Sequence, residues 1–74
     1  MDSVRIGKKL KELRGDRTLR EVASGVGVTV QAICNYENGA RIPRDEVKKS
    51  LARYYRATVS ELFFADDVHE KQTL

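Results

Sequence analysis

Residues 18–39 read TLREVASGVGVTVQAICNYENG, and this stretch decides the fold. Thr18 and Glu21 have the spacing of a capping box, in which each side chain hydrogen bonds the backbone N–H of the other residue. Gly27 interrupts the helical spacing of apolar residues that follows, and Thr29 offers a second N-cap directly after it. The stretch therefore predicts two short helices joined by a tight glycine turn.

Helical spacing of apolar residues continues on both sides of this stretch. Residues 6–13 carry one apolar stripe, and residues 47–55 carry another. The second stripe follows Pro43 and an acidic first turn, and the helix dipole favours acidic residues at the start of a helix. Thr58 and Glu61 form a second capping box before a short closing helix. No segment alternates with a period of two, so the sequence predicts an all-α, compact five-helix bundle over residues 1–65 and a polar tail at 66–74. The two stripes consist of Ile6, Leu10 and Leu13, and of Val47, Leu51, Tyr54 and Tyr55.

The helix predicted over about residues 30–38 has two unlike faces. Ile33 and Tyr36 lie three residues apart and belong to the core face. The opposite face lacks the Lys and Glu of an ordinary solvated helix, and three of its residues, Gln31, Asn35 and Asn38, carry amides that donate and accept at once. Such amides suit the N6/N7 edge of adenine, and small apolar groups suit thymine methyls. An uncharged helix surface without a ligand is the alternative interpretation.

Two helices joined by so short a turn are typical of a helix-turn-helix, which places its second helix in the major groove of DNA. Basic residues flank the uncharged face, and duplex recognition needs this division because phosphate contacts position a protein while base contacts specify the sequence. An αα-corner without a ligand is the alternative on spacing alone. We expect base contacts from Thr29, Val30, Gln31, Cys34 and Asn35, and phosphate contacts from Thr18, Arg20, Asn38, Arg41 and Arg44.

Composition excludes several classes of protein and of site. The chain has 74 residues with one Cys and one His, so it can form neither an internal disulfide nor a closed zinc site, and we expect no metal, no cofactor and no enzyme activity. Residues 1–56 hold 13 of the 14 Lys and Arg and 7 of the 11 acids, a net charge of +6, whereas residues 57–74 carry −3. A basic body favours a polyanionic partner. No apolar run suits a membrane span or a signal peptide, which predicts a cytoplasmic protein.

The chain resembles the XRE-type helix-turn-helix family, the group of Cro and the lambda-type phage repressors. The resemblance spans about residues 4–64 and implies a five-helix domain, usually dimeric, that binds a palindromic operator in double-stranded DNA and regulates transcription. It implies base contacts at Thr29, Val30, Gln31 and Asn35, and phosphate contacts at Asn38 and in the Arg41 loop. The motifs that carry it are Thr18–Ala23, Gly27–Thr29, Gln31–Gly39, Arg41–Pro43 and Thr58–Phe63.

Three features depart from the family pattern. Leu19 stands where many members have a phosphate-binding Gln, and Arg44 stands where a Ser often caps the fourth helix. The resemblance also implies that Glu37 pairs with an Arg of the first helix, for which Arg14 is the candidate and solvent the alternative. Because only three residues separate Arg14 from Thr18, fewer than usual, the first helix is expected to tilt differently, and the sequence leaves this pair open.

Aromatic residues gather near the end of the chain, where four of the five lie. A small pair of helices can bury only part of them, so we expect a symmetric homodimer through the closing helix and its neighbours, with two recognition helices about one DNA turn (~34 Å) apart. A protein-interaction module on the same fold, such as an antitoxin or an anti-repressor partner, is the alternative function. The aromatic residues assigned to the dimer interface are Tyr54, Tyr55, Phe63 and Phe64.

Overall fold

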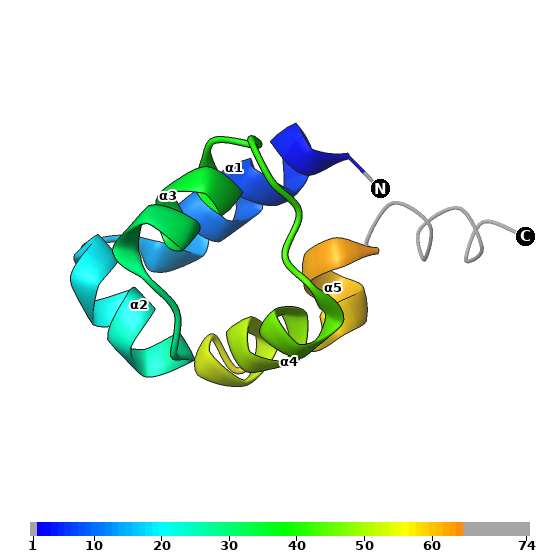
Figure 1. Cartoon of the computed structure of the whole chain (residues 1–74). Coiled ribbons are helices and arrows are strands. Elements are labelled where there is room, and N and C mark those ends of the chain that lie inside the picture. The colour runs from blue at the N-terminus through cyan, green and yellow to red at the C-terminus, as the bar shows by residue number, and fades with distance from the viewer. Residues whose placement is uncertain (1, 65–74) are drawn as a thin grey trace, which may run out of the picture.

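The computed structural model describes residues 2–64, which form five α-helices and no strand (Figure 1). This confirms the predicted all-α, five-helix architecture. The expected domain boundary at residue 65 and the polar tail at 66–74 lie outside the described residues. The helices are α1 (Ser3–Arg14), α2 (Leu19–Val26), α3 (Val30–Glu37), α4 (Asp45–Tyr54) and α5 (Val59–Phe63).

Local hydrogen bonds explain where the helices begin. Both predicted capping boxes form, and in the first the Thr18 hydroxyl accepts from the Glu21 N–H at 3.0 Å while the Glu21 carboxylate accepts from the Thr18 N–H at 3.2 Å. The Asp2 carboxylate caps α1 by accepting from the N–H groups of Val4 and Arg5, a cap that the sequence analysis did not identify. These side chains satisfy donors that a helix start otherwise leaves unpaired.

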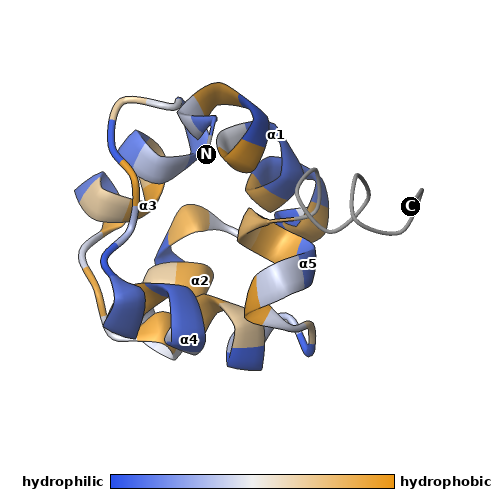
Figure 2. Cartoon of the chain, turned by 90° about the vertical axis from the view of Figure 1, so that its right-hand side faces the viewer, coloured by the Kyte–Doolittle hydropathy of each residue, from blue (hydrophilic) through white to orange (hydrophobic). Residues whose placement is uncertain are grey.

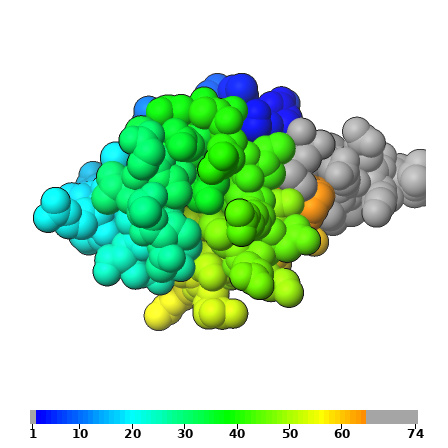
Figure 3. Space-filling model, in the orientation of Figure 1, coloured from blue at the N-terminus to red at the C-terminus, as the bar shows by residue number. Residues whose placement is uncertain are grey.

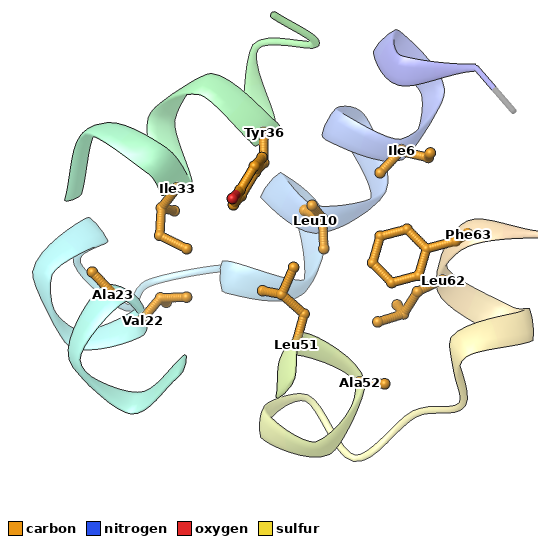
Figure 4. Packing of buried hydrophobic residues seen from close by; sticks show 10 residues of the cluster. All are labelled: Ile6, Leu10, Val22, Ala23, Ile33, Tyr36, Leu51, Ala52, Leu62 and Phe63. Atoms are coloured by element: carbon orange, nitrogen blue, oxygen red, sulfur yellow. The ribbon is translucent and has the colours of Figure 1, made fainter. Parts of the chain in front are cut away.

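The core takes residues from all five helices (Figure 4). Every residue that the sequence analysis placed on an apolar stripe is either buried or packed against this cluster. In Figure 2 hydrophobic segments of several helices face the middle of the molecule, while much of α1 and α4 carries hydrophilic colours. The buried members are Ile6, Leu10, Val22, Ala23, Ile33, Tyr36, Leu51, Ala52, Leu62 and Phe63.

Two glycines let neighbouring helices approach closely. Gly7 of α1 lies directly against the carbonyl oxygens of Tyr36 and Glu37, so that a Cβ at this position would collide with the last turn of α3. Gly25 of α2 lies against the ring of Tyr54, which fills the space where a side chain would otherwise stand. Gly7 thus brings α1 against α3, and Gly25 brings α2 against α4.

Candidate nucleic-acid interface

A short turn sets α3 at a defined angle to α2. Gly27 adopts a left-handed conformation with a φ of 86°, which glycine reaches without steric cost, and the N–H groups of Gly27 and Val28 both donate to the carbonyl of Ala23. The Thr29 hydroxyl then caps α3 by accepting from the Ala32 N–H at 3.0 Å. The two predicted helices and their glycine turn are confirmed, and α3 ends at Glu37, one residue before the expected end.

The core face of α3 anchors the helix, as the sequence analysis expected. Ile33 and Tyr36 are buried, and they pack among residues contributed by the other helices (Figure 4). Figure 3 shows the opposite side, where α3 and the loop after it form the centre of one face of the molecule. The exposed side of α3 is therefore the middle of a surface and not its edge.

Uncharged side chains make up the exposed side of α3. Thr29, Val30 and Gln31 are exposed, and Val30 keeps 42% of its surface open to solvent. Cys34 and Asn35 are half-buried. The five residues with predicted base contacts therefore lie together at the start of α3 and in its next turn. Among them the apolar side chain of Val30 is exposed beside polar side chains.

Side-chain hydrogen bonds link the polar residues of this face in two pairs. Gln31 Nε2 donates to Asn35 Oδ1 at 3.0 Å, and Asn38 Nδ2 donates to Cys34 Sγ at 3.4 Å. Each pair spans four residues, the spacing that makes side chains neighbours on a helix. These pairs were not among the predictions from the sequence, although the spacing of the polar residues was the signal that could have indicated them.

Three arginines with predicted phosphate contacts have side chains that are available to bind an anion. Arg20 at the start of α2, Arg41 in the loop and Arg44 before α4 are all exposed, and none forms an ion pair with another residue of the described range 2–64. Arg44 occupies the N-cap position of α4 without a capping hydrogen bond, so its side chain is not used there. The exposed Thr18 is partly engaged, because Glu21 occupies its N–H and its hydroxyl oxygen.

Comparison with known proteins identifies the family. Residues 5–62 match the family model for a helix-turn-helix domain. The chain belongs to the helix-turn-helix domain family. It is similar to the cryptic phage CTXphi transcriptional repressor RstR of Vibrio cholerae, with 38% identity over 56 residues. The aligned part is 73% of this chain and 50% of that relative, so the chain spans about half the relative's length. No solved structure matches the chain.

This family assignment confirms the resemblance to the XRE-type helix-turn-helix proteins, and the matched residues include all of α2, the turn and α3. The two-helix motif is therefore not a chance αα-corner. Within residues 2–64 no group of three potential metal ligands is present, and no helix there has the length and apolar character that a membrane span requires.

An ion pair ties the end of α3 to α1 in this helix-turn-helix domain. Arg14 Nε donates to Glu37 Oε2 at 2.8 Å, and the two side chains are only 19% and 6% exposed. The hydrogen bond that Arg14 donates to Glu37 is the main reason that the pKa of Arg14 lies above its ordinary value. Arg14 Nη1 also donates to the carbonyl of Arg17 at 2.9 Å, which braces the short connection to α2. The pair that the sequence left open therefore forms.

The four aromatic residues assigned to a dimer interface fall into two groups. Tyr54 and Tyr55 meet edge to face with ring centroids 5.1 Å apart, and the Arg17 guanidinium lies 5.7 and 5.8 Å from the two centroids. Phe63 is a core residue of this chain at 4% exposure, whereas Phe64 is half-buried. Tyr54, Tyr55 and Phe64 thus keep surface that a partner could cover, and Phe63 keeps almost none.

Lys48 of α4 is a buried cation that the sequence analysis did not identify. Its Nζ lies 5.7 Å from the ring centroid of Phe63 and 5.3 Å from that of Phe64, and it is 3.7 Å from an Asp45 carboxylate oxygen. The stem of a Lys can cover apolar surface while its ammonium meets ring faces and a carboxylate. Lys48 precedes the buried residues Leu51 and Ala52 by three and four positions, and this spacing was the available signal.

Proposed function

We propose that this chain is a sequence-specific DNA-binding transcriptional regulator, a repressor, that places α3 in the major groove of a palindromic operator. The observation that carries the proposal is the exposed side of α3, where amides and an aliphatic side chain stand in place of charges. The arginines with predicted phosphate contacts are exposed as well and form no ion pair within residues 2–64. Such a surface offers base-edge contacts in the centre and phosphate contacts around them. Membership of the helix-turn-helix family and the likeness to a transcriptional repressor support it.

The test separates base reading from phosphate binding. Duplexes selected from a random pool should share a motif, and the affinity for them should fall by several decades between low and moderate salt, because each neutralised phosphate releases counterions. Replacing Gln31 by Ala should cost about 1–3 kcal/mol and relax the preference at one position of the motif. Replacing Arg41 by Ala should instead weaken binding to all duplexes alike and reduce the salt dependence.

Lys9→Ala is the matched control for Arg41→Ala. Lys9 lies on α1, where its charge acts on Glu61 of α5, away from the exposed side of α3. Its removal should change affinity much less than the loss of Arg41. A chain that selects no motif, or that co-purifies with a tightly bound protein instead, would show that the domain is a protein-interaction module and not a DNA reader.

We further propose that the regulator acts as a symmetric homodimer through α5 and its neighbours. Tyr54, Tyr55 and Phe64 retain surface for such an interface, whereas the burial of Phe63 within its own chain removes it from the contact. A dimer of this kind binds two half-sites about one DNA turn apart. Sedimentation equilibrium of the free protein should show a dimer that Phe64→Glu converts to a monomer, and a monomeric wild-type chain would contradict the proposal.

A further inference from the structure

The hydrogen bond between Gln31 and Asn35 runs in one direction, and that direction matters for base reading. Gln31 Nε2 is the donor and Asn35 Oδ1 the acceptor, at 3.0 Å. Gln31 is exposed and Asn35 is half-buried, so the shorter and better fixed side chain holds the longer and freer one. The bond lies on the exposed surface of the molecule, so core burial does not require it.

The bond leaves on Gln31 the two groups that adenine requires. A Gln amide carries two N–H donors and one carbonyl acceptor, and Asn35 takes only one of the donors. Oε1 and the second N–H remain free on the exposed side of α3. Adenine offers an N6 donor and an N7 acceptor side by side in the major groove, which pair with these two groups. A bond in the opposite direction would engage Oε1, the atom that accepts from N6.

From this geometry we propose that Asn35 is a positioning residue that orients Gln31, and that Gln31 reads an adenine. The proposal rests on the proposed function as a DNA-binding regulator and names the base that the exposed side of α3 reads. A Gln that is already held in its binding orientation loses less side-chain freedom when it meets the base. The smaller loss of side-chain entropy on binding corresponds to a roughly 2- to 12-fold gain in the preference for adenine.

The second hydrogen-bonded pair on this face provides a matched control. Asn38 donates to Cys34 Sγ at 3.4 Å with the same four-residue spacing, but it makes no hydrogen bond with Gln31. Both Asn35 and Asn38 are therefore amides bonded to a neighbour one turn earlier, and only Asn35 can orient Gln31. Replacing Asn38 by Leu removes a predicted phosphate contact and should weaken all duplexes alike, but it should leave the base preference of Gln31 unchanged.

The experiment compares two substitutions of Asn35 that differ in one property. Asp keeps an oxygen that can accept from Gln31 Nε2, whereas Leu has a similar shape and no acceptor. The duplex selected by the wild-type chain from a random pool is the probe, together with its three base-pair variants at the position where Gln31→Ala relaxes the preference. Dissociation constants for these four duplexes give the base preference of each variant, and circular dichroism with thermal unfolding verifies that each variant is folded.

Wild-type protein should prefer adenine at this position, and Asn35→Leu should reduce that preference roughly 2- to 12-fold. Asn35→Asp should keep the preference while weakening the binding of all four duplexes, because its charge repels the phosphates. In the free protein, Asn35→Leu should also shift the NMR resonances of the Gln31 side-chain amide, whereas Asn38→Leu should not. This second readout does not depend on DNA.

The outcomes separate this inference from the function on which it rests. If the wild-type chain selects no motif, the proposed function fails and the inference fails with it. If the chain selects a motif but Asn35→Leu keeps the full preference, or Asn35→Asp loses as much of it as Asn35→Leu, only the positioning role of Asn35 is overturned. A preferred base other than adenine at this position also overturns the inference and leaves the function standing.

Discussion

Gly7 controls the distance between α1 and α3. Its missing side chain leaves room for the carbonyl oxygens of Tyr36 and Glu37, which belong to the backbone and cannot rotate away. The contact places the last turn of α3 against α1, and the orientation of the exposed side of α3 depends on that placement. A glycine inside a helix is otherwise unfavourable by up to about 1 kcal/mol relative to Ala.

Gly7→Ala should therefore destabilise the domain even though Ala favours helix formation. Because the contact is with two backbone carbonyls, the overpacking should cost about 2–3 kcal/mol, and the gain in helix propensity returns about 1 kcal/mol, so we expect a net loss of about 1–2 kcal/mol in the free energy of unfolding. Urea denaturation followed by circular dichroism measures it. The exposed neighbour Lys8, replaced by Ala, serves as control and should change stability by less than about 0.5 kcal/mol. A stabilised Gly7→Ala variant would disprove the close contact.

Arg14 and Glu37 form the second residue-scale link between α1 and α3. Because the Glu37 side chain is only 6% exposed, removing its partner leaves a poorly solvated carboxylate. Arg14→Met should thus lower the free energy of unfolding by roughly 3 kcal/mol, near the lower end for buried pairs. Replacing both residues, as Arg14→Met with Glu37→Leu, should cost less than the sum of the single losses. Strictly additive losses in a double-mutant cycle would show that the two charges do not interact.

At the scale of the element, α5 depends on its cap more than the longer helices do. It has five residues, too few for a helix to be stable alone, yet it contributes Leu62 and Phe63 to the core. The Thr58 hydroxyl accepts from the Glu61 N–H at 3.0 Å, and the Glu61 carboxylate accepts from the Thr58 N–H at 2.9 Å. This reciprocal pair satisfies two of the few backbone donors that a one-turn helix presents.

Thr58→Ala should accordingly destabilise the domain by about 1 kcal/mol, the usual cost of losing an N-cap hydroxyl. Thermal unfolding and urea titration of the variant measure the loss. Ser60 lies exposed in the same helix and has a hydroxyl that makes no capping bond, so Ser60→Ala is the control and should change stability by less than about 0.5 kcal/mol. Equal effects of the two substitutions would mean that the capping box contributes nothing.

For the whole molecule, the packing of α1, α3 and α4 predicts how stability depends on alkaline pH. Burial, and then the nearby Glu37 carboxylate, raise the pKa of Tyr55 from 10.0 to about 12. Between these values the unfolded chain releases the Tyr55 proton while the folded chain keeps it, so the free energy of unfolding falls as the pH rises from about 10 to about 12. Below pH 10 both states keep the proton, and this dependence is absent.

Tyr55→Phe should flatten the fall in stability over that alkaline range. Urea denaturation of the wild-type and variant chains at several pH values gives the slope of the free energy of unfolding against pH for each chain. The difference between the two slopes removes the contributions of the other Tyr and Lys residues, which are common to both. Tyr54→Phe is the control, because it changes the neighbouring ring at the same helix end. Tyr36→Phe is unsuitable as a control because Tyr36 lies in the core. Identical slopes for the wild type and Tyr55→Phe would contradict the raised pKa.

The sequence by itself determined the elements of this protein and the two faces of α3. Capping boxes, glycine turns and helical periodicity act over three or four residues, so Thr18, Thr29 and Thr58 were correctly placed as helix starts without knowledge of the rest of the fold. The burial of Ile33 and Tyr36 and the exposure of Val30 and Gln31 follow from the same periodicity. The contacts of the exposed residues with DNA stay predictions.

Only the tertiary structure decided which residues of different helices meet. It joined Arg14 to Glu37, placed Phe63 in the core and not on an open interface, and buried Lys48 against two aromatic rings. These contacts depend on the distances and angles between helices, which the close approach at Gly7 and the turn at Gly27 set. The spacing of residues along one helix carries no information about them, because it describes each helix only relative to its own axis.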